Sequence, residues 1–546
     1  MSIKERLLRL LGDLSSKRPV ALSVYGASIG YFLLLILFPA TLGILTGLGS
    51  LGQVIADSSL MSTALSAVFA SVALALSVSV LDVLVGLPLA WLIVRRKGKL
   101  LTVLDALVDL PLIIPTVTLG YSVLLFWTSG GPLGFLGLPP LSPGWGLVML
   151  LHFSFSYPVV VRVLVGKMQE LSAVYETAAR TLGATPFTAA RTIAVPLLSS
   201  GIVASFLLAF ARSMSETGAT LMVAGTFENG PIFIRRSLDQ GVEGPLVFTS
   251  IVLMSVSIAI FYVIKAMRVN IRTPFEKADV RLEKKLSRGP VVTLGTILTV
   301  GILLVLVILP ALSLSLSFAP VALSGGTLGD IISGSGVWGS FWSGVALSYS
   351  IALIVTLLNV VFSLPMAVLI SRRKMGKLTS TVFDSLSSVP IVIPSVALGV
   401  SMKLFWGNFA IPEFWLIALS HLSITYPYLV TTLVSALDDI PHYLEETART
   451  LGADSFTSFS TITLPLARYS LLSGAILTFT RSVDETGATL AVSSTMRTVP
   501  VLLVDWVKNP FPGSEVAVGI GTTVLLLTSI IILLLLKGLS REKRHA

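Results

Sequence analysis

The chain has 546 residues, of which 54% are hydrophobic and only 12% are charged. Soluble domains use roughly 25% charged residues, so this composition excludes a soluble globular protein and indicates one that resides in a lipid bilayer. The net charge of +10 is spread over many short segments, which argues against a nucleic-acid partner, and the lack of cysteine excludes disulfides and thiolate metal sites.

Long apolar runs recur along the whole chain. Because a helix needs about 20 apolar residues to cross a bilayer, each such run predicts a membrane span. The sequence therefore predicts an all-α polytopic membrane protein with about 12 transmembrane helices, near 22–47, 62–94, 106–127, 144–166, 196–224, 247–267, 290–317, 343–370, 386–406, 411–434, 465–492 and 516–537.

The positions of lysine and arginine predict the orientation of these spans, because cytoplasmic loops carry an excess of both. Most of the 38 Lys and Arg residues fall in segments that would share one side of the membrane: 1–20, 95–99, 162–195, 265–289, 371–377, 435–468 and 537–546. We therefore expect a multi-pass protein of the cell membrane with both termini in the cytoplasm. The first apolar run is too long for the h-region of a cleaved signal peptide, so we interpret it as a retained span.

The sequence contains an internal duplication. The segment ETAARTLGATPFTAARTIAVPL (176–197) returns as EETARTLGADSFTSFSTITLPL (445–466), an offset of 269 residues. The same offset aligns ARSMSETGATLMV with TRSVDETGATLAV, whereas LPLIIPTVTLG (110–120) and VPIVIPSVALG (389–399) differ by 279 because an outer loop of the first half holds an insertion. Each repeat holds six spans, so the halves are predicted to be parallel and related by an axis along the membrane normal.

Both copies of the recurring segment lie between the fourth and fifth spans of their half, on the predicted cytoplasmic side. Glu176 and Arg180 are spaced i, i+4, as are Glu445 and Arg449, which predicts a helix-supporting pair in each copy. A glycine then stops the helix, and a capping residue begins a second short helix. An interfacial connector would explain one such hairpin, but two copies at matching positions favour a docking element for another protein.

The hairpins resemble the EAA motif of binding-protein-dependent ABC importer permeases of the type I fold. The pattern E-x-A/T-A-x3-G-x9-I-x2-P is present twice, although Glu446 and Thr447 replace the small residues usual in the second copy. In that family the motif forms the coupling helix, which seats in a cytoplasmic ATPase and transmits its closure to the spans. The resemblance assigns ATPase coupling to Glu176, Ala179, Arg180, Gly183, Ile193 and Pro196, and to Glu445, Ala448, Arg449, Gly452, Ile462 and Pro465.

The resemblance implies that this chain is a transport subunit that supplies both halves of the path. The sequence has no G-x4-G-K-[ST] phosphate loop, so ATP hydrolysis is expected from two copies of a separate cytoplasmic ABC ATPase. An external substrate-binding protein that delivers a small solute is implied as well, and we expect no cofactor and no metal site. The alternative is an ion-gradient-driven secondary transporter with two six-span halves, which leaves the hairpins unexplained. An intramembrane enzyme is disfavoured because no paired catalytic set is found on aligned spans.

The resemblance covers nearly the whole chain, and the first and seventh spans carry the least of it. The predicted division is an N-terminal cytoplasmic segment and first span at 1–59, a first ABC transmembrane type-1 domain at 60–267, a cytoplasmic linker at 268–289, the seventh span and an outer loop at 290–339, a second ABC transmembrane type-1 domain at 340–537 and a cytoplasmic tail at 538–546.

Charged residues lie within the predicted fifth and eleventh spans, where they are costly and tend to face a cavity or a partner. Two interpretations remain open: ion pairs that lock helix packing, or polar steps along the transport path. A Gly-Ala-Thr triplet follows each set and suits close helix approach or a helix break. The candidate path residues are Arg212, Glu216 and Thr220 in the first half and Arg481, Asp484, Glu485 and Thr489 in the second.

Two features of the sequence indicate different solutes. The pattern R-x3-E-x-G-A-T resembles the corresponding span of permeases for molybdate, tungstate and sulfate, whereas fusion of both halves in one chain is more typical of iron(III) and thiamine permeases. We expect an inorganic ion, with an oxyanion ahead of iron(III), and thiamine stays open.

Further residues in the spans allow two roles each. Paired prolines are predicted to bend or break spans three and nine, either as structural kinks or as a constriction of the path. A histidine in each of spans four and ten predicts an interhelical hydrogen bond or a gate. Aspartates that follow the basic loops RRKGK and RRKMGK are expected to pair with those loops. These residues are Pro111, Pro115, Pro390 and Pro394, His152 and His421, and Asp105 and Asp384.

Overall fold

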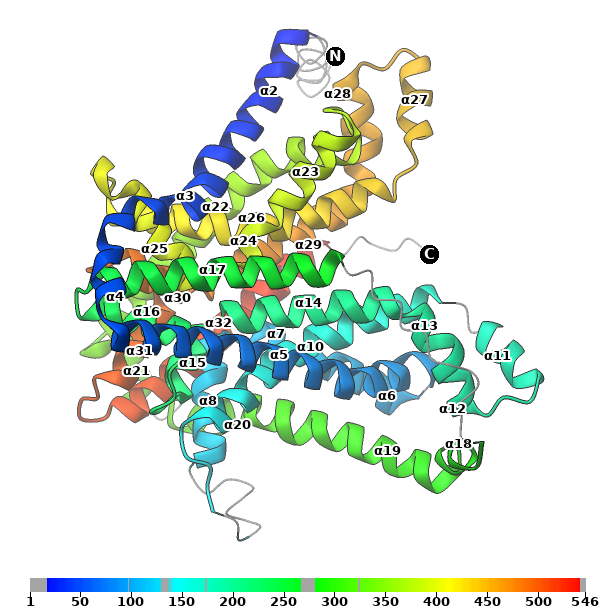
Figure 1. Cartoon of the computed structure of the whole chain (residues 1–546), viewed down its shortest axis with the longest axis horizontal. Helices are drawn as coiled ribbons and strands as arrows, with labels where there is room; N and C mark the ends of the chain where they lie inside the picture. The colour runs from blue at the N-terminus through cyan, green and yellow to red at the C-terminus, as the bar shows by residue number, and fades with distance from the viewer. Residues whose placement is uncertain are drawn as a thin grey trace.

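The computed structural model describes residues 17–96, 98–128, 137, 139–171, 174–266, 280–322 and 325–540. Every regular element within these ranges is a helix (Figure 1), which confirms the all-α prediction. Parts of several predicted segments lie outside the described residues: the cytoplasmic segment before residue 17, much of the outer-loop insertion of the first half, the first part of the linker and the end of the tail.

The first half begins with a broken first span and continues into the long helix α5. The carboxylate of Asp57 accepts hydrogen bonds from the amides of Ser59 and Leu60 and so caps the start of α5. In chain order the elements are α2 (Arg18–Gly30), η1 (Tyr31–Leu37), α3 (Phe38–Leu42), η2 (Gly43–Leu51), α4 (Gly52–Ala56), α5 (Ser58–Arg95), α6 (Lys99–Val108), α7 (Leu110–Ile113), α8 (Thr116–Thr128), α10 (Trp145–Glu170), α11 (Val174–Thr181), α12 (Pro186–Ala189), η3 (Ala190–Ala194), α13 (Val195–Leu197), α14 (Ser199–Ser215), α15 (Gly218–Val223), α16 (Gly230–Asp239) and α17 (Glu243–Ala266).

The second half repeats this plan after the linker helix α18. Its hairpin is formed by α27 and α28, which correspond to α11 and α12. The elements are α18 (Val280–Leu286), α19 (Gly289–Ile302), η5 (Leu303–Ile308), α20 (Leu309–Ala322), α21 (Gly325–Ser333), α22 (Val337–Ser371), α23 (Lys377–Ser387), α24 (Val389–Val392), α25 (Ser395–Trp406), η6 (Gly407–Phe409), α26 (Glu413–Asp438), α27 (His442–Thr450), α28 (Ser455–Ser458), η7 (Phe459–Thr463), α29 (Leu464–Val483), α30 (Gly487–Val492), α31 (Val499–Lys508) and α32 (Ser514–Ser540).

The number of membrane spans agrees with the sequence. Among the described residues, nine helices are long and apolar enough to cross a membrane, and three bent pairs raise the number to twelve. Two of these pairs are bent by 107° and 106°, at Pro115 and Pro394. Because proline disfavours helical geometry in the residue before it, Ile114 and Ile393 are extended and interrupt the helix. The prediction that prolines bend or break spans three and nine is confirmed.

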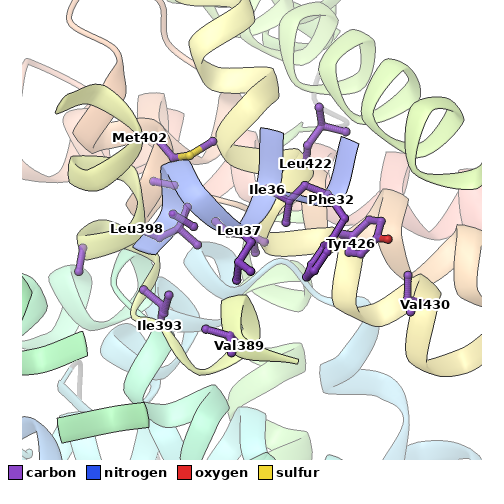
Figure 2. Packing of buried hydrophobic residues seen from close by; sticks show 14 of the residues in the cluster. Phe32, Ile36, Leu37, Val389, Ile393, Leu398, Met402, Leu422, Tyr426 and Val430 are labelled. Atoms are coloured by element: carbon purple, nitrogen blue, oxygen red, sulfur yellow. The ribbon is translucent and has the colours of Figure 1, made fainter. Parts of the chain in front are cut away.

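The first span of each half packs against the other half. Phe32 and Ile36 of η1 lie beside Tyr426 of α26 and Leu398 of α25 (Figure 2), and the rings of Phe32 and Tyr426 stack with centroids 5.4 Å apart. Because lipid tails are as apolar as these side chains, the contact stabilises the fold through close packing and ring stacking, which contributes about 0.5–1.5 kcal/mol for an aromatic pair. The first span is therefore part of the core of the second half.

A repeated serine contact shows that this exchange is reciprocal. Ser401 of α25 donates to the carbonyl oxygen of Pro39 in the first span at 2.7 Å. We call residues at equivalent positions of the two repeats repeat mates. The repeat mate of Ser401 is Ser122 in α8, which donates to the carbonyl oxygen of Pro310 in the seventh span. The two halves are interlocked through their first and seventh spans.

The two ends of the molecule differ in character. The hairpin helices α11, α12, α27 and α28 lie toward one end, on the right of Figure 1, and α4, α16 and α31 lie toward the other. We call these the hairpin end and the outer end.

Candidate functional site

Each copy of the recurring segment forms the predicted hairpin. Gly183 follows α11 with φ of 96° and Gly452 follows α27 with φ of 94°, a region in which only glycine is free of strain. α12 and α28 then begin after Thr185 and Asp454, whose side chains accept hydrogen bonds from amides of the first turn. The predicted stop and start signals are confirmed.

The motif glutamates pair with arginines of another span. Arg95, at the end of α5, donates from Nε and Nη2 to Oε1 of Glu176 at 3.0 and 2.6 Å. Arg372, directly after α22, donates in the same way to Glu445 at 3.1 and 2.7 Å. Two guanidinium donors on one half-buried carboxylate outweigh a local i, i+4 pair, which contributes only about 0.2–0.5 kcal/mol. Each hairpin is thus tied to the span that precedes a basic loop.

The predicted partners of these glutamates, Arg180 and Arg449, are exposed and form no ion pair with any residue that the structure describes. This corrects the expected i, i+4 pairs within the hairpins. Leu182 and Leu451, which are repeat mates at the hairpin tips, are 90% and 84% exposed. An exposed arginine beside an exposed leucine on an anchored hairpin is a surface suited to a protein partner.

The carboxylate of Glu445 is held in its charged form. Burial acts to raise its pKa, but hydrogen bonds from Arg372 and Thr463 and the charge of Arg372 outweigh this effect and hold the pKa below its ordinary value. Thr463 of η7 donates to Glu445 at 2.9 Å, so this residue also joins the two arms of the hairpin. Of the other motif residues, Pro465 is exposed, and Ala179, Ile193, Pro196, Ala448 and Ile462 are half-buried.

A cavity of about 370 Å³ lies between the two halves. Its walls contain repeat mates, including Leu208 and Leu477 and also Arg212 and Arg481, each pair offset by 269 residues. A cavity that touches both members of such pairs lies on the axis that relates the halves. An axial cavity lined by both repeats is the expected location of a transport path.

The two arginines of this cavity have different partners. Nη2 of Arg481 lies 2.7 Å from Oε2 of Glu485, which is the ion pair of the first of the two interpretations. Arg212 forms no ion pair with any residue in the described ranges, and its guanidinium lies over the ring of Phe155, 5.3 Å from the centroid. The ion-pair interpretation is therefore wrong for Arg212 and Glu216, although both Glu216 and Glu485 lie beyond the ends of their helices.

Glu216 and Glu485 cap two short helices. Their carboxylates accept hydrogen bonds from the amides of Ala219 and Ala488 at 3.0 and 2.9 Å, at the starts of α15 and α30. The predicted continuous spans 196–224 and 465–492 are therefore broken at these glutamates. Both carboxylates are buried and do not line the cavity.

The segments after these glutamates meet at the axis. A side chain added at Gly218 would come within 2.6 Å of Thr486, and one added at Gly487 would come within 2.8 Å of Thr217. Each glycine therefore lies against the threonine of the other half, as close approach requires. We call Thr217, Gly218, Thr486 and Gly487 the junction. The junction therefore fills the space along the axis next to the cavity.

Asp484 lines the cavity and connects the halves. Its carboxylate accepts a hydrogen bond from the amide of Thr116 at 2.6 Å, at the start of α8. The repeat mates of this pair are Ser215 and Ser395, and there the side chain of Ser395 donates to the carbonyl oxygen of Ser215 at 3.0 Å. The same contact involves a carboxyl group on one side of the axis only.

The histidines of spans four and ten bond to neighbouring helices. The ring nitrogens of His152 lie 2.8 Å from Ser213 and 2.9 Å from Thr220, and those of His421 make the equivalent contacts with Ser482 and Thr489. The interhelical hydrogen bonds are confirmed. Thr220 and Thr489 are fully buried, so Arg212, Arg481 and Asp484 are the predicted path residues that line the cavity.

Among the described residues, Asp105 pairs with Arg162 and not with the basic loop that precedes it. Its carboxylate lies 2.5 Å from Nη1 of Arg162, and Asp109 lies 2.5 Å from Nε of the same side chain. Arg95, the first arginine of the loop RRKGK, forms an ion pair with Glu176. Arg162 lines the cavity as well, so it is a charged wall residue that the sequence alone did not reveal.

Comparisons with known proteins agree with this arrangement. The family model described as binding-protein-dependent transport system inner membrane component matches residues 82–272 and 360–544. The chain is 31% identical over 249 residues to a probable molybdenum ABC transporter permease protein of Haloferax volcanii, covering 42% of this chain and 87% of that protein.

Two further relatives match over shorter segments. The chain is 38% identical over 167 residues to the molybdenum transport system permease protein ModB of Mycobacterium tuberculosis, and 35% identical over 151 residues to the sulfate transport system permease protein CysT of Salmonella typhimurium. These matches cover 30% and 27% of this chain, and 62% and 54% of the relatives, which is less than two thirds of their lengths. With the duplicated hairpin and the axial cavity, the two matched regions show that the chain belongs to the binding-protein-dependent permeases of ABC importers, with both halves in one polypeptide.

Proposed function

We propose that the chain forms the transport path of an ATP-driven importer for a tetrahedral oxyanion, with molybdate or tungstate as the first candidates and sulfate next. The hairpin end faces the cytoplasm, where two copies of an ABC ATPase dock, one on each hairpin, and hydrolyse ATP. Both termini lie on that side of the plasma membrane. An external substrate-binding protein delivers the solute to the outer end.

The observation that carries the choice of solute is the pair of arginines on the axis. Arg212 and Arg481 both line the cavity, and Arg212 has no carboxylate within ion-pair distance among the described residues. A guanidinium presents several donors in a plane that matches an oxyanion, whereas it repels a metal cation. The relatives named for molybdenum and sulfate transport support the same class.

Coupling follows from the way in which the hairpins are anchored. When the ATPases close, they push both hairpins, and the contacts of Glu176 with Arg95 and of Glu445 with Arg372 pass this movement to α5 and α22. The two halves then rock about the axis and separate at the junction, as in alternating access.

The proposed division of the chain follows the duplication. The transport domains comprise 60–267 and 340–537, joined by the cytoplasmic linker at 268–289 and flanked by the first span at 1–59, the seventh span at 290–339 and the tail at 538–546.

The test is uptake into vesicles that contain the full chain, its ATPase and its binding protein. We expect ATP-dependent accumulation of radioactive molybdate, tungstate or sulfate, and no accumulation of iron(III) or thiamine. Accumulation of only iron(III) or thiamine would overturn the choice of solute. Uptake that follows an ion gradient without ATP or the ATPase would overturn the mechanism.

A further inference from the structure

A second polar cavity lies at the outer end. It has a volume of about 490 Å³ and is formed between α16 of the first half and the segment containing α31 of the second. The polar residues that matter for its chemistry are Arg235 and Asp239 from α16, and Arg497, Asp505, Lys508 and Asn509. We call it the outer pocket.

The outer pocket lies on the same axis as the central cavity. Asp239 and Lys508 are repeat mates, since 239 plus 269 is 508, and both line this one pocket. A site touched by both mates lies close to the axis that relates the halves. The outer pocket, the junction and the central cavity therefore follow one another along one line.

One short helix separates the outer pocket from the central cavity. Nη1 of Arg235 donates to the carbonyl oxygen of Leu490 at 2.8 Å, near the end of α30. The other end of α30 begins at Gly487 in the junction, next to Asp484 of the cavity wall. Six residues of helix rise about 9 Å, so a small ion in the outer pocket would be one short step from the closed junction.

The charges of the outer pocket leave one cation without a partner. Arg235 pairs with Asp239 at 2.7 Å, and Arg497 pairs with Asp505 at 2.8 Å. Lys508 forms no ion pair with any residue that the structure describes. Burial lowers its pKa, and the nearby charge of Arg235 lowers it further against the opposing effect of the two aspartates. A cation in such surroundings is stabilised by an added anion.

The donors present also favour an anion. Both carboxylates of the pocket already bind an arginine, so few acceptors remain for a metal cation. Arg497 contacts Asp505 through Nε and has further N–H groups to donate. These groups together with the lysine ammonium suit an ion with several acceptor oxygens.

We propose that the outer pocket is a binding site for a tetrahedral oxyanion, in which the solute waits between release from the binding protein and opening of the junction. Lys508 supplies the unpaired charge, and Arg497 supplies directed donors, whereas Asn509 only lines the pocket. The identity of the anion as the transported solute rests on the proposed function, whereas the pocket itself is defined by its own residues.

The natural absence of cysteine allows a direct test. In the full complex, Asn509→Cys introduces the only thiol of this chain, and its labelling can be followed on the 58.0 kDa band. We expect a methanethiosulfonate reagent with a sulfonate group to react about tenfold faster than one with a trimethylammonium group, because a positive site attracts the anion. Sodium molybdate should slow labelling, whereas sodium chloride of equal ionic strength should not.

Charge variants test whether Lys508 causes the preference for the anionic reagent and the protection by molybdate. Combined with Asn509→Cys, Lys508→Glu should reverse the preference and abolish protection by molybdate. Lys403→Glu is the matched control, because Lys403 is exposed at the end of α25 and does not line the pocket. Equal reaction rates of the two reagents, or no protection, would overturn the site.

The outcomes separate this inference from the proposed function. If the complex imports an oxyanion while no oxyanion protects the thiol, the outer site is wrong and the function stands. If oxyanions protect the thiol but none is imported, the function is wrong and the site stands. Should Asn509→Cys fail to assemble, initial uptake rates of Lys508→Glu and Lys403→Glu at low ionic strength replace the labelling, and equal rates would overturn the site.

Discussion

The two halves place an equivalent arginine in the cavity but surround it differently. Arg481 is neutralised by Glu485, which is only 1% exposed, whereas Arg212 lies over Phe155 without a carboxylate partner in the described chain. A contact across the axis differs in the same way, with Asp484 on one side and Ser215 on the other. A permease made of two identical subunits would change both sides at once. Joining the halves in one chain allows each side of the path to change alone.

A buried polar contact away from the path shows the same divergence. Asn359 of α22 accepts a hydrogen bond from Tyr31 of the first span at 2.8 Å and donates to Thr425 at 2.9 Å. Its counterpart in α5 is Asp82, which accepts from Ser156 through one oxygen, while the other oxygen has no hydrogen-bond partner among the residues that the structure describes. The seventh span is apolar where the first span has Tyr31. One half therefore satisfies its buried polar group, and the other does not.

The largest expected effect separates the two arginines. Arg481→Met leaves the buried Glu485 without its counter-charge, which should destabilise the protein by about 3–5 kcal/mol. Arg212→Met removes no ion pair and should lower thermal stability much less, although it should slow oxyanion uptake. Thermal unfolding of both variants in the same detergent measures the difference. Equal losses of stability would show that the asymmetry of the two pairs has no energetic consequence.

Exchanging the buried polar residues should have the next largest effect. Asn359→Asp removes a donor to Thr425 and buries an acid, at a cost of about 1–3 kcal/mol. Asp82→Asn installs the residue of the other half and should be neutral or stabilising. The midpoint of denaturant unfolding measures both, and a larger loss for Asp82→Asn would contradict this comparison.

The hairpins should respond alike despite their different sequences. Valine at Gly183 or Gly452 places a branched side chain at a positive φ, which costs about 1–2 kcal/mol of hairpin stability. Each substitution should lower ATPase association about tenfold, and the two together about a hundredfold if they are independent. Quantitative co-purification with the ATPase tests this, and Gly289→Val, at a helix start with no positive φ, is the control. Normal association of the double variant would argue against docking at the hairpins.

The smallest expected effect is a pH dependence of the second hairpin. Because the folded state lowers the pKa of Glu445, the stabilisation is fully present above the ordinary carboxyl pKa and is lost as pH falls through the lower folded value. Amides of α27 should therefore keep their hydrogen-exchange protection at pH values near the ordinary glutamate pKa of about 4.3 and lose it only in more acidic solution. Glu445→Gln should remove this pH dependence, and an unchanged profile in that variant would exclude Glu445 as its source.

Much of the fold is predictable because it depends on local signals. Apolar runs predict the spans, glycine and capping residues predict the hairpins, and Pro115 and Pro394 predict the sharp bends. The break of the fifth and eleventh spans was less predictable, because Glu216 and Glu485 are compatible with a helix until their carboxylates find the amides ahead of them.

The remaining features depend on contacts between distant segments. The pairing of Arg95 with Glu176 was missed because Arg180 is closer in sequence, yet two donors from a rigid fork bind better than one local pair. The repetition of a basic loop after α5 and α22 was the signal that could have revealed it. The exchange of first spans was not predictable, because an apolar face in the sequence does not indicate which half it packs against. That choice depends on contacts such as the stacking of Phe32 on Tyr426.

The exchanged first span also limits how the protein can be made. Tyr31 and its partner Asn359 are 328 residues apart. At synthesis rates of about 5–20 residues per second, the first span is in the membrane for roughly 15–65 s before its partner is made. During that interval its aromatic face is in contact with lipid. Truncation after the first half would make this waiting state permanent, so nascent chains halted there should be early substrates for membrane quality control.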